Sequence, residues 1–418
     1  MKDYLKRIKE FSANAKLFLS TSALIAFSYG VSQLIFNLYI LELGYSEDFV
    51  GLILFSGAIS LGLAAIPAGA LCDKIGRKRS LISGLIISAI AYTVLYVTEI
   101  DFMILLSNGI AGGVFSLYLV AESPFMMENS DVEERAHLFS INFAILTIFT
   151  TVGYLIGGLL PRFLASLLDT FPESVITYRT TLVISIVFQY LSVITLFSVR
   201  PRKKEETNFL RKDTAENSSR PKNIRLYLLF AVVNGLIGLG AGFVVPLFNV
   251  FFKGRFDVSL EVMGMIFVGG QLTVAIANII APSLAKRIGN VRSVALTQLS
   301  SIPFLIGIGM SYNILLSVPF YLLRGALMNM AYPIFSMFTM EVFEKDERAK
   351  VAGTNLTAWN LLWAFSALLA GIVMSTGDYT TPYIFTCIVY VISPTLSLVF
   401  FHGEERRLQR GGRIKNKT

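Results

Sequence analysis

Long apolar runs separated by short polar segments dominate this chain. Each run has about 20 or more mostly apolar residues, enough for a helix to cross a bilayer, and none alternates as a barrel strand would. The runs cover residues 17–41, 48–71, 79–98, 102–127, 137–160, 178–199, 225–252, 259–284, 291–311, 314–340, 350–374 and 379–401. This pattern predicts an all-α integral membrane protein with twelve transmembrane helices.

The composition agrees with a lipid environment. Hydrophobic residues make up 54% of the chain and charged residues 15%, whereas soluble proteins carry about 25% charged residues. A soluble, disordered or collagen-like chain is thereby excluded. Cys72 and Cys387 lie in or beside apolar runs, so they indicate no disulfide framework. The lipid bilayer is the first partner that we expect.

Basic residues are concentrated on one side of the predicted topology. Of the 36 Lys and Arg residues, 31 lie in segments that would share a side with the N-terminus. Cytoplasmic loops carry such an excess, so we expect a multi-pass protein of the plasma or inner membrane with both termini in the cytoplasm. The net charge of +8 follows from these scattered cations, and we expect no nucleic-acid partner.

The chain also repeats itself at an offset of 213 residues. The matching positions are polar residues and glycines, which composition alone does not align: Gly51 with Gly264, Gly76 with Gly289, Glu128 with Glu341, Arg135 with Arg348, and Asn142 with Asn355. Six spans in each repeat make both halves start from the same side. The repeat predicts two six-helix halves related by a pseudo-two-fold axis along the membrane normal.

This organisation divides the chain into five parts. We expect a cytoplasmic N-terminal flank at 1–16, an N-terminal six-helix half at 17–199 and a polar cytoplasmic linker at 200–224. The last two parts of the chain are a C-terminal six-helix half at 225–401 and a cytoplasmic basic tail at 402–418. We expect the chain to act as a monomer.

The polar segment between the second and third spans carries a specific motif. Residues 69–79 read Gly-Ala-Leu-Cys-Asp-Lys-Ile-Gly-Arg-Lys-Arg, which predicts a tight cytoplasmic turn with one acid and four bases. The segment resembles the signature loop of the major facilitator superfamily, Gly-x-x-x-Asp-Lys/Arg-x-Gly-Arg-Lys/Arg, at every position. A second copy at 286–292 has lost the acid. Twelve spans in two repeats extend the resemblance over the whole chain.

The resemblance implies a conformational latch and a central cavity. In that family the loop acid meets the start of the eleventh helix, here near Arg348, and a loop base pairs with an acid at the end of the fourth helix. Spans one, four, seven and ten line a cavity for a small-molecule substrate. The expected latch residues are Gly69, Asp73, Gly76, Arg77, Glu128, Arg135 and Arg348.

Two charged residues lie inside predicted spans, Glu122 in the fourth and Arg324 in the tenth. A charge in lipid is costly, so such residues usually face water and have a function. Glu122 shares a helical face with Asn108 and Tyr118, and Arg324 lies on the repeat-equivalent face, so we expect water there. The two residues would lie about 16 Å apart along the membrane normal, too far for a direct ion pair.

These charges suggest a division of roles. Glu122 would carry a coupling proton, and Arg324 would attract an anionic or polar group of the substrate. Two alternatives remain open: Glu122 at the cytoplasmic edge of the membrane, and Arg324 in a structural ion pair or bonded to a carbonyl group.

Further polar and aromatic residues in the spans are candidates for substrate binding, although each also suits helix–helix contacts. They are Asn108, Tyr118, Gln33, Asn37, Asn329, Tyr332, Trp359 and Trp363. The two histidines, His137 and His402, are isolated, and no nucleophilic or nucleotide-binding motif occurs. We therefore expect no metal site, no cofactor and no enzymatic activity.

The predicted function is proton-coupled export of a small, partly apolar organic compound by alternating access. Residues 153–158, Gly-Tyr-Leu-Ile-Gly-Gly, resemble an antiporter segment, Gly-Pro-x-x-Gly-Gly, with Tyr154 in place of proline. Close helix packing through small residues is the alternative interpretation. Two other functions stay open: proton-coupled uptake of a small organic anion, and a non-coupled role as a lipid scramblase, receptor or assembly partner.

Overall fold

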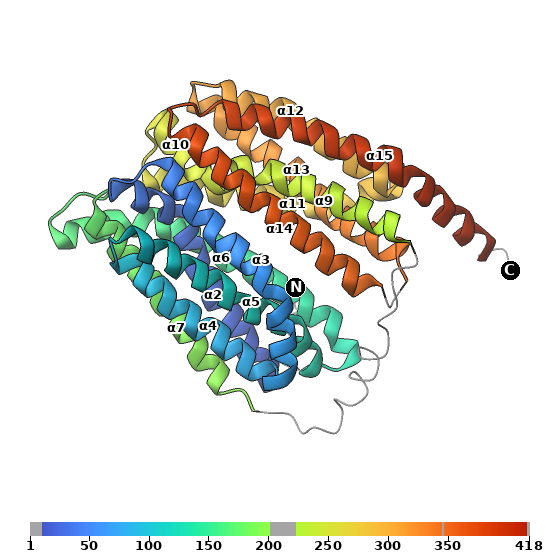
Figure 1. The fold of residues 1–418 in the computed structure, drawn as a ribbon, viewed down its shortest axis with the longest axis horizontal. Helices are drawn as coiled ribbons and strands as arrows, with labels where there is room; N and C mark the ends of the chain where they lie inside the picture. Colours follow the sequence, from blue (N-terminus) through green and yellow to red (C-terminus); the bar gives the residue numbers. More distant parts are fainter. Residues whose placement is uncertain (1–10, 201–222, 345–346, 416–418) are drawn as a thin grey trace. The chain divides into compact units, whose positions relative to one another are not determined.

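The computed structural model describes residues 11–200, 223–344 and 347–415, and the described parts are helical apart from short connections (Figure 1). Twelve helices in these parts are long and apolar enough to cross a membrane, as predicted. The first six are α2 (Ala13–Glu42), α3 (Glu47–Ile75), α4 (Arg77–Val97), α5 (Asp101–Glu128), α6 (Val132–Leu168) and α7 (Val175–Phe197).

The next six spans begin with a broken helix. α9 (Ile224–Val244) continues through a 3-10 turn, η2 (Val245–Leu247), into α10 (Phe248–Phe256). Pro246 lies in this turn, where its missing N–H breaks the helical hydrogen-bond pattern. The remaining helices are α11 (Leu260–Ile288), α12 (Asn290–Met310), α13 (Ile314–Val342), α14 (Arg348–Met374) and α15 (Thr381–Lys415).

The chain forms two compact units. The first unit comprises Met1–Ser46, Leu52–Glu216 and Ser259–Val268, and the second comprises Glu47–Gly51, Asn217–Val258 and Gly269–Thr418. Of the expected flank, linker and tail, residues 1–10, 201–222 and 416–418 lie outside the described part of the chain.

The motif loop is shorter than the sequence analysis expected. α3 remains helical through Ile75 and α4 begins at Arg77, so a single residue, Gly76, makes the turn. Gly76 has a φ of 90° and Gly289, its repeat equivalent, a φ of 93°. Only glycine adopts this backbone conformation without strain. The predicted tight turn over 69–79 is therefore wrong except at Gly76: residues 69–75 belong to α3, and residues 77–79 belong to α4.

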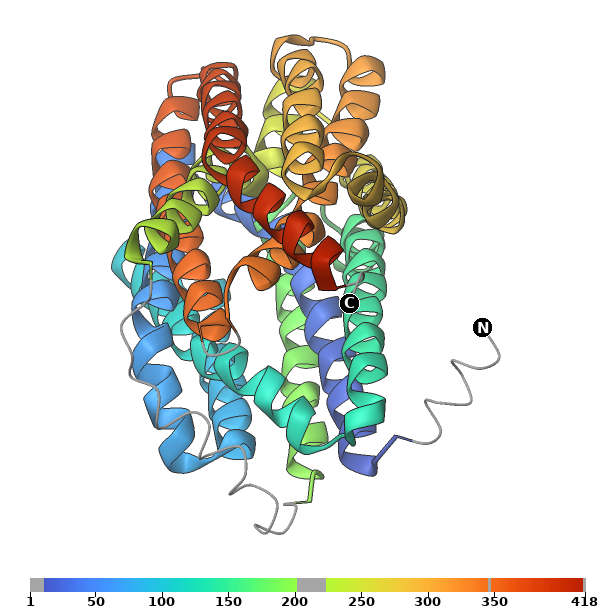
Figure 2. The same ribbon diagram turned by 90° about the vertical axis from the view of Figure 1, so that its right-hand side faces the viewer.

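In the first unit, α2 lies between α6 and α7, and the three helices run side by side (Figure 2). Glycines allow close approach: a Cβ on Gly153 of α6 would lie 2.9 Å from the Cα of Gly30 on α2. An apolar core that includes Phe18, Phe125 and Leu138 fills the end of the unit next to the motif loop.

The second unit packs α9 against α14 and α15. Phe230 on α9 anchors its core, with its ring centroid 4.1 Å from that of Phe401 on α15. The last helix does not end with this core, because α15 continues to Lys415 and its final turns extend beyond the other helices of the unit (Figure 1). The expected basic tail therefore begins as helix.

Candidate functional site

Glu122 is half-buried on α5 of the first unit. The neighbouring helix α6 brings Asn142 to it, and Asn142 Nδ2 donates a hydrogen bond to Glu122 Oε1 at 3.0 Å. Asn142 is only 4% exposed, and its own Oδ1 is buried without a hydrogen-bond partner. In the described part of the chain, Glu122 has no ion pair with Lys or Arg. A carboxyl group and a partly unpaired amide thus face each other between two helices.

The rest of this face of α5 packs inside the first unit. Asn108 Nδ2 donates to the Ile53 carbonyl oxygen on α3 at 2.6 Å. Tyr118, one turn before Glu122, is 3% exposed and packs on Gly84 of α4. The expectation of a water-lined face is therefore wrong for Tyr118, because helix packing covers the position.

Arg324 is buried in the second unit, with 4% exposure. Its Nη2 donates to the Tyr390 hydroxyl on α15 at 3.0 Å, while its Nε has no hydrogen-bond partner. The ring centroids of Phe248 and Tyr390 lie 5.6 and 5.8 Å from its guanidinium carbon. No described carboxylate pairs with it. The expected water-facing position is thus wrong for Arg324 too, and its bonded partner is a hydroxyl rather than an acid or a carbonyl.

The other candidate binding residues lie in two separate groups. In the first unit, Gln33 is exposed and donates to the Tyr29 hydroxyl, whereas Asn37 is buried. In the second unit, Trp359 and Trp363 stack along α14 with centroids 6.1 Å apart. Two residues of α13 in that unit are exposed, Asn329, which donates to its own helix, and Tyr332.

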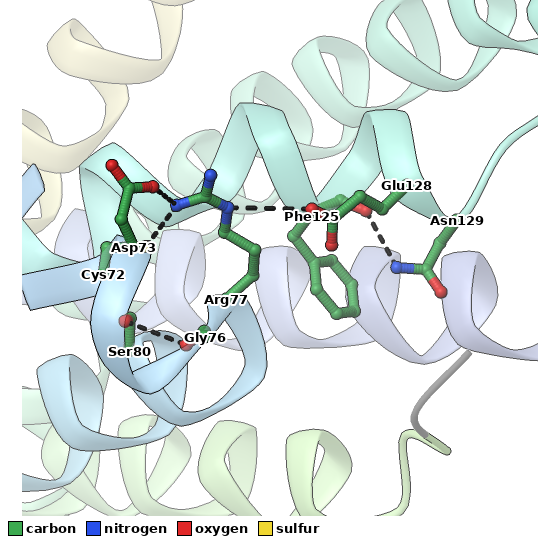
Figure 3. Close-up of polar contacts among 8 residues, drawn as sticks. All are labelled: Cys72, Asp73, Gly76, Arg77, Ser80, Phe125, Glu128 and Asn129. Carbon is green, nitrogen blue, oxygen red and sulfur yellow. Dashed lines mark hydrogen bonds and ion pairs between the residues drawn. The ribbon is translucent and has the colours of Figure 1, made fainter. Parts of the chain in front are cut away.

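The motif loop holds a chain of charges in the first unit (Figure 3). Arg77 Nη1 lies 2.7 Å from Asp73 Oδ1, and Arg77 Nε lies 3.7 Å from Glu128 Oε1. The same Nη1 is 3.1 Å from the buried Cys72 sulfur. One guanidinium therefore joins the end of α3 to the end of α5, and it compensates two acids that would otherwise repel each other.

The remaining expected latch residues have more local contacts. Gly69 lies within α3 with open space around it. Arg348, the first residue of α14, donates from Nε to the Phe343 carbonyl oxygen at 3.1 Å. Arg135 is half-buried and its Nε has no hydrogen-bond partner.

Sequence reasoning did not single out several partners. Lys78 of the motif donates from Nζ to the Phe197 and Val199 carbonyl oxygens, at 3.0 and 2.6 Å, and so ties the loop to the end of α7. Tyr390 had no signal in the sequence, because an aromatic residue in an apolar span is ordinary. Asn142 did have one: it matches Asn355 in the internal repeat.

The glycines of the export-like segment take part in packing. Gly153 approaches α2 as described above, and a Cβ on Gly157 would lie 3.2 Å from the Cα of Val31. These contacts fit the packing interpretation of residues 153–158, so the segment adds no independent support for export.

Solved structures with a similar fold are transport proteins. The nucleoside transporter NupG has a TM-score of 0.74 at 15% identity, covering 93% of this chain and 99% of that chain. A D-xylose-proton symporter has a TM-score of 0.72 at 13% identity, covering 92% and 96%. The human organic anion transporter MFSD10 (TETRAN) has a TM-score of 0.63 at 17% identity, covering 92% and 99%. No curated protein matches the chain.

The family model gives the broader assignment. The model of the Major Facilitator Superfamily matches residues 18–255 and again residues 230–416, which together span nearly the whole chain. Twelve membrane-spanning helices in two repeats, with the motif loop after α3, agree with this match. The chain therefore belongs to the major facilitator superfamily and is a multi-pass membrane transport protein rather than an enzyme.

Proposed function

We propose that this protein is a secondary active transporter that works by alternating access and couples the export of a small, partly apolar organic compound to protons. The observation that carries the proposal is the half-buried carboxyl group of Glu122, which has a neutral amide partner. An ionisable group retained inside a membrane protein is costly, and proton relays are one of the uses that justify this cost.

The pair of Glu122 and Asn142 can serve both protonation states. The ionised carboxylate accepts the hydrogen bond from Asn142 Nδ2. A protonated Glu122 has an O–H to donate, and the unpartnered Asn142 Oδ1 is an acceptor on the same amide. Rotation of the amide is enough to exchange one arrangement for the other. Proton uptake and release at Glu122 would therefore leave neither form without a partner.

The motif loop would control the conformational cycle. Arg77 joins Asp73 and Glu128 across the ends of two helices, and such a partly exposed ion-pair chain contributes little free energy. A weak contact suits a latch, because it has to break in each cycle. The excess of basic residues on one side supports cytoplasmic termini, and we propose that the protein works as a monomer in the plasma or inner membrane.

Arg324 favours a second candidate function, proton-coupled uptake of a small organic anion. Its guanidinium is buried with one neutral hydrogen bond and one unpartnered N–H, so a carboxylate would supply the missing charge. A neighbour with a similar fold is named an organic anion transporter. The two candidates differ in the charge of the substrate and in the direction of transport.

Purified protein in proteoliposomes can test both candidates. Compounds that raise the melting temperature of the protein are selected first, because a ligand of the folded state stabilises it. Each is then added outside vesicles that contain a pH-sensitive dye, with and without an imposed pH gradient. We expect compound-dependent proton movement in the wild type and none in Glu122→Gln.

Asp101→Asn is the matched control, since Asp101 is an exposed acid at the start of the same helix. It should behave as the wild type. Full pH-gradient dependence in Glu122→Gln would refute the proton role. The charge of the active compounds, and whether they accumulate with or against the proton gradient, would decide between the two candidates.

A further inference from the structure

A buried carboxylate lies at the start of α12 in the second unit. Glu405, from the part of α15 beyond the apolar span, is 5% exposed. Its Oε1 accepts the backbone N–H groups of Asn290 and Val291, the latter at 3.2 Å. These two residues open α12, so the acid satisfies N–H groups that have no partner within the helix, and it lies at the positive end of the helix dipole.

The turn beside this carboxylate leaves no room for a side chain. A Cβ on Gly289 would lie 2.8 Å from Glu405 Oε1. Gly76, its equivalent in the first unit, has nearly the same φ, but nothing lies within 4 Å of the position of its Cβ. The close approach of an acid is thus a property of the second loop alone.

The charges that organise the first loop are absent from the second. The offset of 213 places Lys286 at the position of Asp73 and Asn290 at the position of Arg77. Asn290 Nδ2 donates to Glu341 Oε2 at 3.1 Å, where the first unit has the ion pair of Arg77 and Glu128.

The loop and the last helix also exchange hydrogen-bonding roles between the two units: the loop side chain donates in the first unit, whereas the side chain of the last helix accepts in the second. In the first unit, the loop cation Lys78 donates to carbonyl oxygens at the end of α7. In the second unit, a carboxylate from α15 accepts from the start of the loop's helix, and the residue at the position of Lys78 is Val291.

We propose that Glu405 is the positioning residue of the α11–α12 loop, and that it performs in the second unit the organising role that the motif charges perform in the first. The helix beyond residue 401 is then a working part of the second unit instead of a dispensable tail. This proposal does not depend on proton coupling or on the identity of the substrate.

Hydrogen exchange on the full-length protein in detergent micelles tests the proposal. Glu405→Met keeps the bulk of the side chain without an acceptor, and Glu405→Gln keeps one oxygen without the charge. We expect about tenfold faster exchange at the amides of Asn290 and Val291 in the Met variant, and a partial rescue in the Gln variant. The loop of the first unit should not change.

Glu404→Gln is the matched control, because Glu404 is the neighbouring acid and pairs with Arg407 on its own helix. It should exchange as the wild type. Wild-type exchange at both amides in Glu405→Met would overturn the proposal, and so would equal effects of the Met and Gln variants, because a packing role alone would not distinguish an acceptor from a methyl group.

The glycine pair gives a second test in case the Met variant does not fold. Gly289→Ala and Gly76→Ala carry the same backbone strain, but only the first displaces Glu405. We expect the larger fall in melting temperature for Gly289→Ala, and a smaller excess over Gly76→Ala when Glu405→Gln is also present. Equal falls for the two glycine variants would contradict the proposal.

Discussion

Ala111 and Arg324 occupy the same position in the two repeats, and both side chains are buried in their own units. The second unit therefore has a guanidinium at the repeat position where the first has a methyl group. A side chain of this size and charge needs a new environment, which Tyr390 and Phe248 supply. The asymmetry between the repeats marks Arg324 as a functional candidate.

Replacing Arg324 with Met should separate its functional role from its structural one. A buried cation with one neutral hydrogen bond contributes little net stability, because the bond offsets only part of the cost of removing the charge from water. We therefore expect Arg324→Met to change the free energy of unfolding by less than about 1 kcal/mol or to raise it. If Arg324 binds an anion, carboxylate compounds should raise the melting temperature of the wild type and not of this variant.

Tyr390→Phe is the control for Arg324→Met, because it removes the hydroxyl that Arg324 bonds and leaves the charge in place. It should destabilise the protein. A large stability loss in Arg324→Met would indicate that the cation holds the unit together.

The hydrogen bond between Asn142 and Glu122 predicts energetic coupling. Removing a donor to a charged group costs about 1.5–3 kcal/mol, so Asn142→Ala should destabilise the wild type by this amount and the Glu122→Gln variant by less. A double-mutant cycle on melting or denaturant curves measures the difference. The repeat provides a control: Asn355 matches Asn142, but Phe335 stands where Glu122 does, so the cycle of Asn355→Ala with Phe335→Leu should lack this charge-dependent coupling.

Arg77 should matter more for transport than for stability. Its ion pairs with Asp73 and Glu128 are partly exposed, and pairs of this kind contribute about 0.2–1 kcal/mol. We expect Arg77→Gln to change the free energy of unfolding by less than about 1 kcal/mol while transport in proteoliposomes falls about tenfold. Arg79→Gln removes an exposed base two residues away and should retain transport; equal losses in the two variants would show that only loop charge matters.

A pH dependence is expected at the start of α15. Asp378 accepts the backbone N–H groups of Thr380 and Thr381, at 2.9 and 3.0 Å. Hydrogen bonds from Thr381 are the main cause that lowers the pKa of Asp378 below its ordinary value, and the nearby Arg255 adds to the effect. A lowered pKa in the folded state stabilises the protein above the unfolded pKa of about 3.9, and this contribution is lost as pH falls through the folded pKa.

Asp378→Asn, which cannot ionise, measures this contribution. The wild type should melt at a higher temperature than the variant near neutral pH, and the difference should shrink as the pH falls below about 4. A difference that stays constant from pH 7 to pH 3 would mean that the charge of Asp378 is irrelevant.

The sequence was sufficient for the architecture. A helix must be long and apolar to cross lipid, and twelve such runs were visible, as were the repeat at Gly76 and Gly289 and the family motif. The sequence did not show how far α3 and α15 continue beyond their apolar runs, because polar residues extend a helix past the membrane as readily as they end it.

The surroundings of the charged residues were decided by tertiary structure alone. The internal repeat placed Glu122 and Arg324 on equivalent faces, but it could not show that Asn142 bonds the first or that Tyr390 and Phe248 enclose the second. It also could not show that Glu405 reaches the start of α12, more than a hundred residues away in the chain. Hydrophobic length is a property of one segment, whereas a hydrogen bond between helices depends on how two segments pack and rotate against each other.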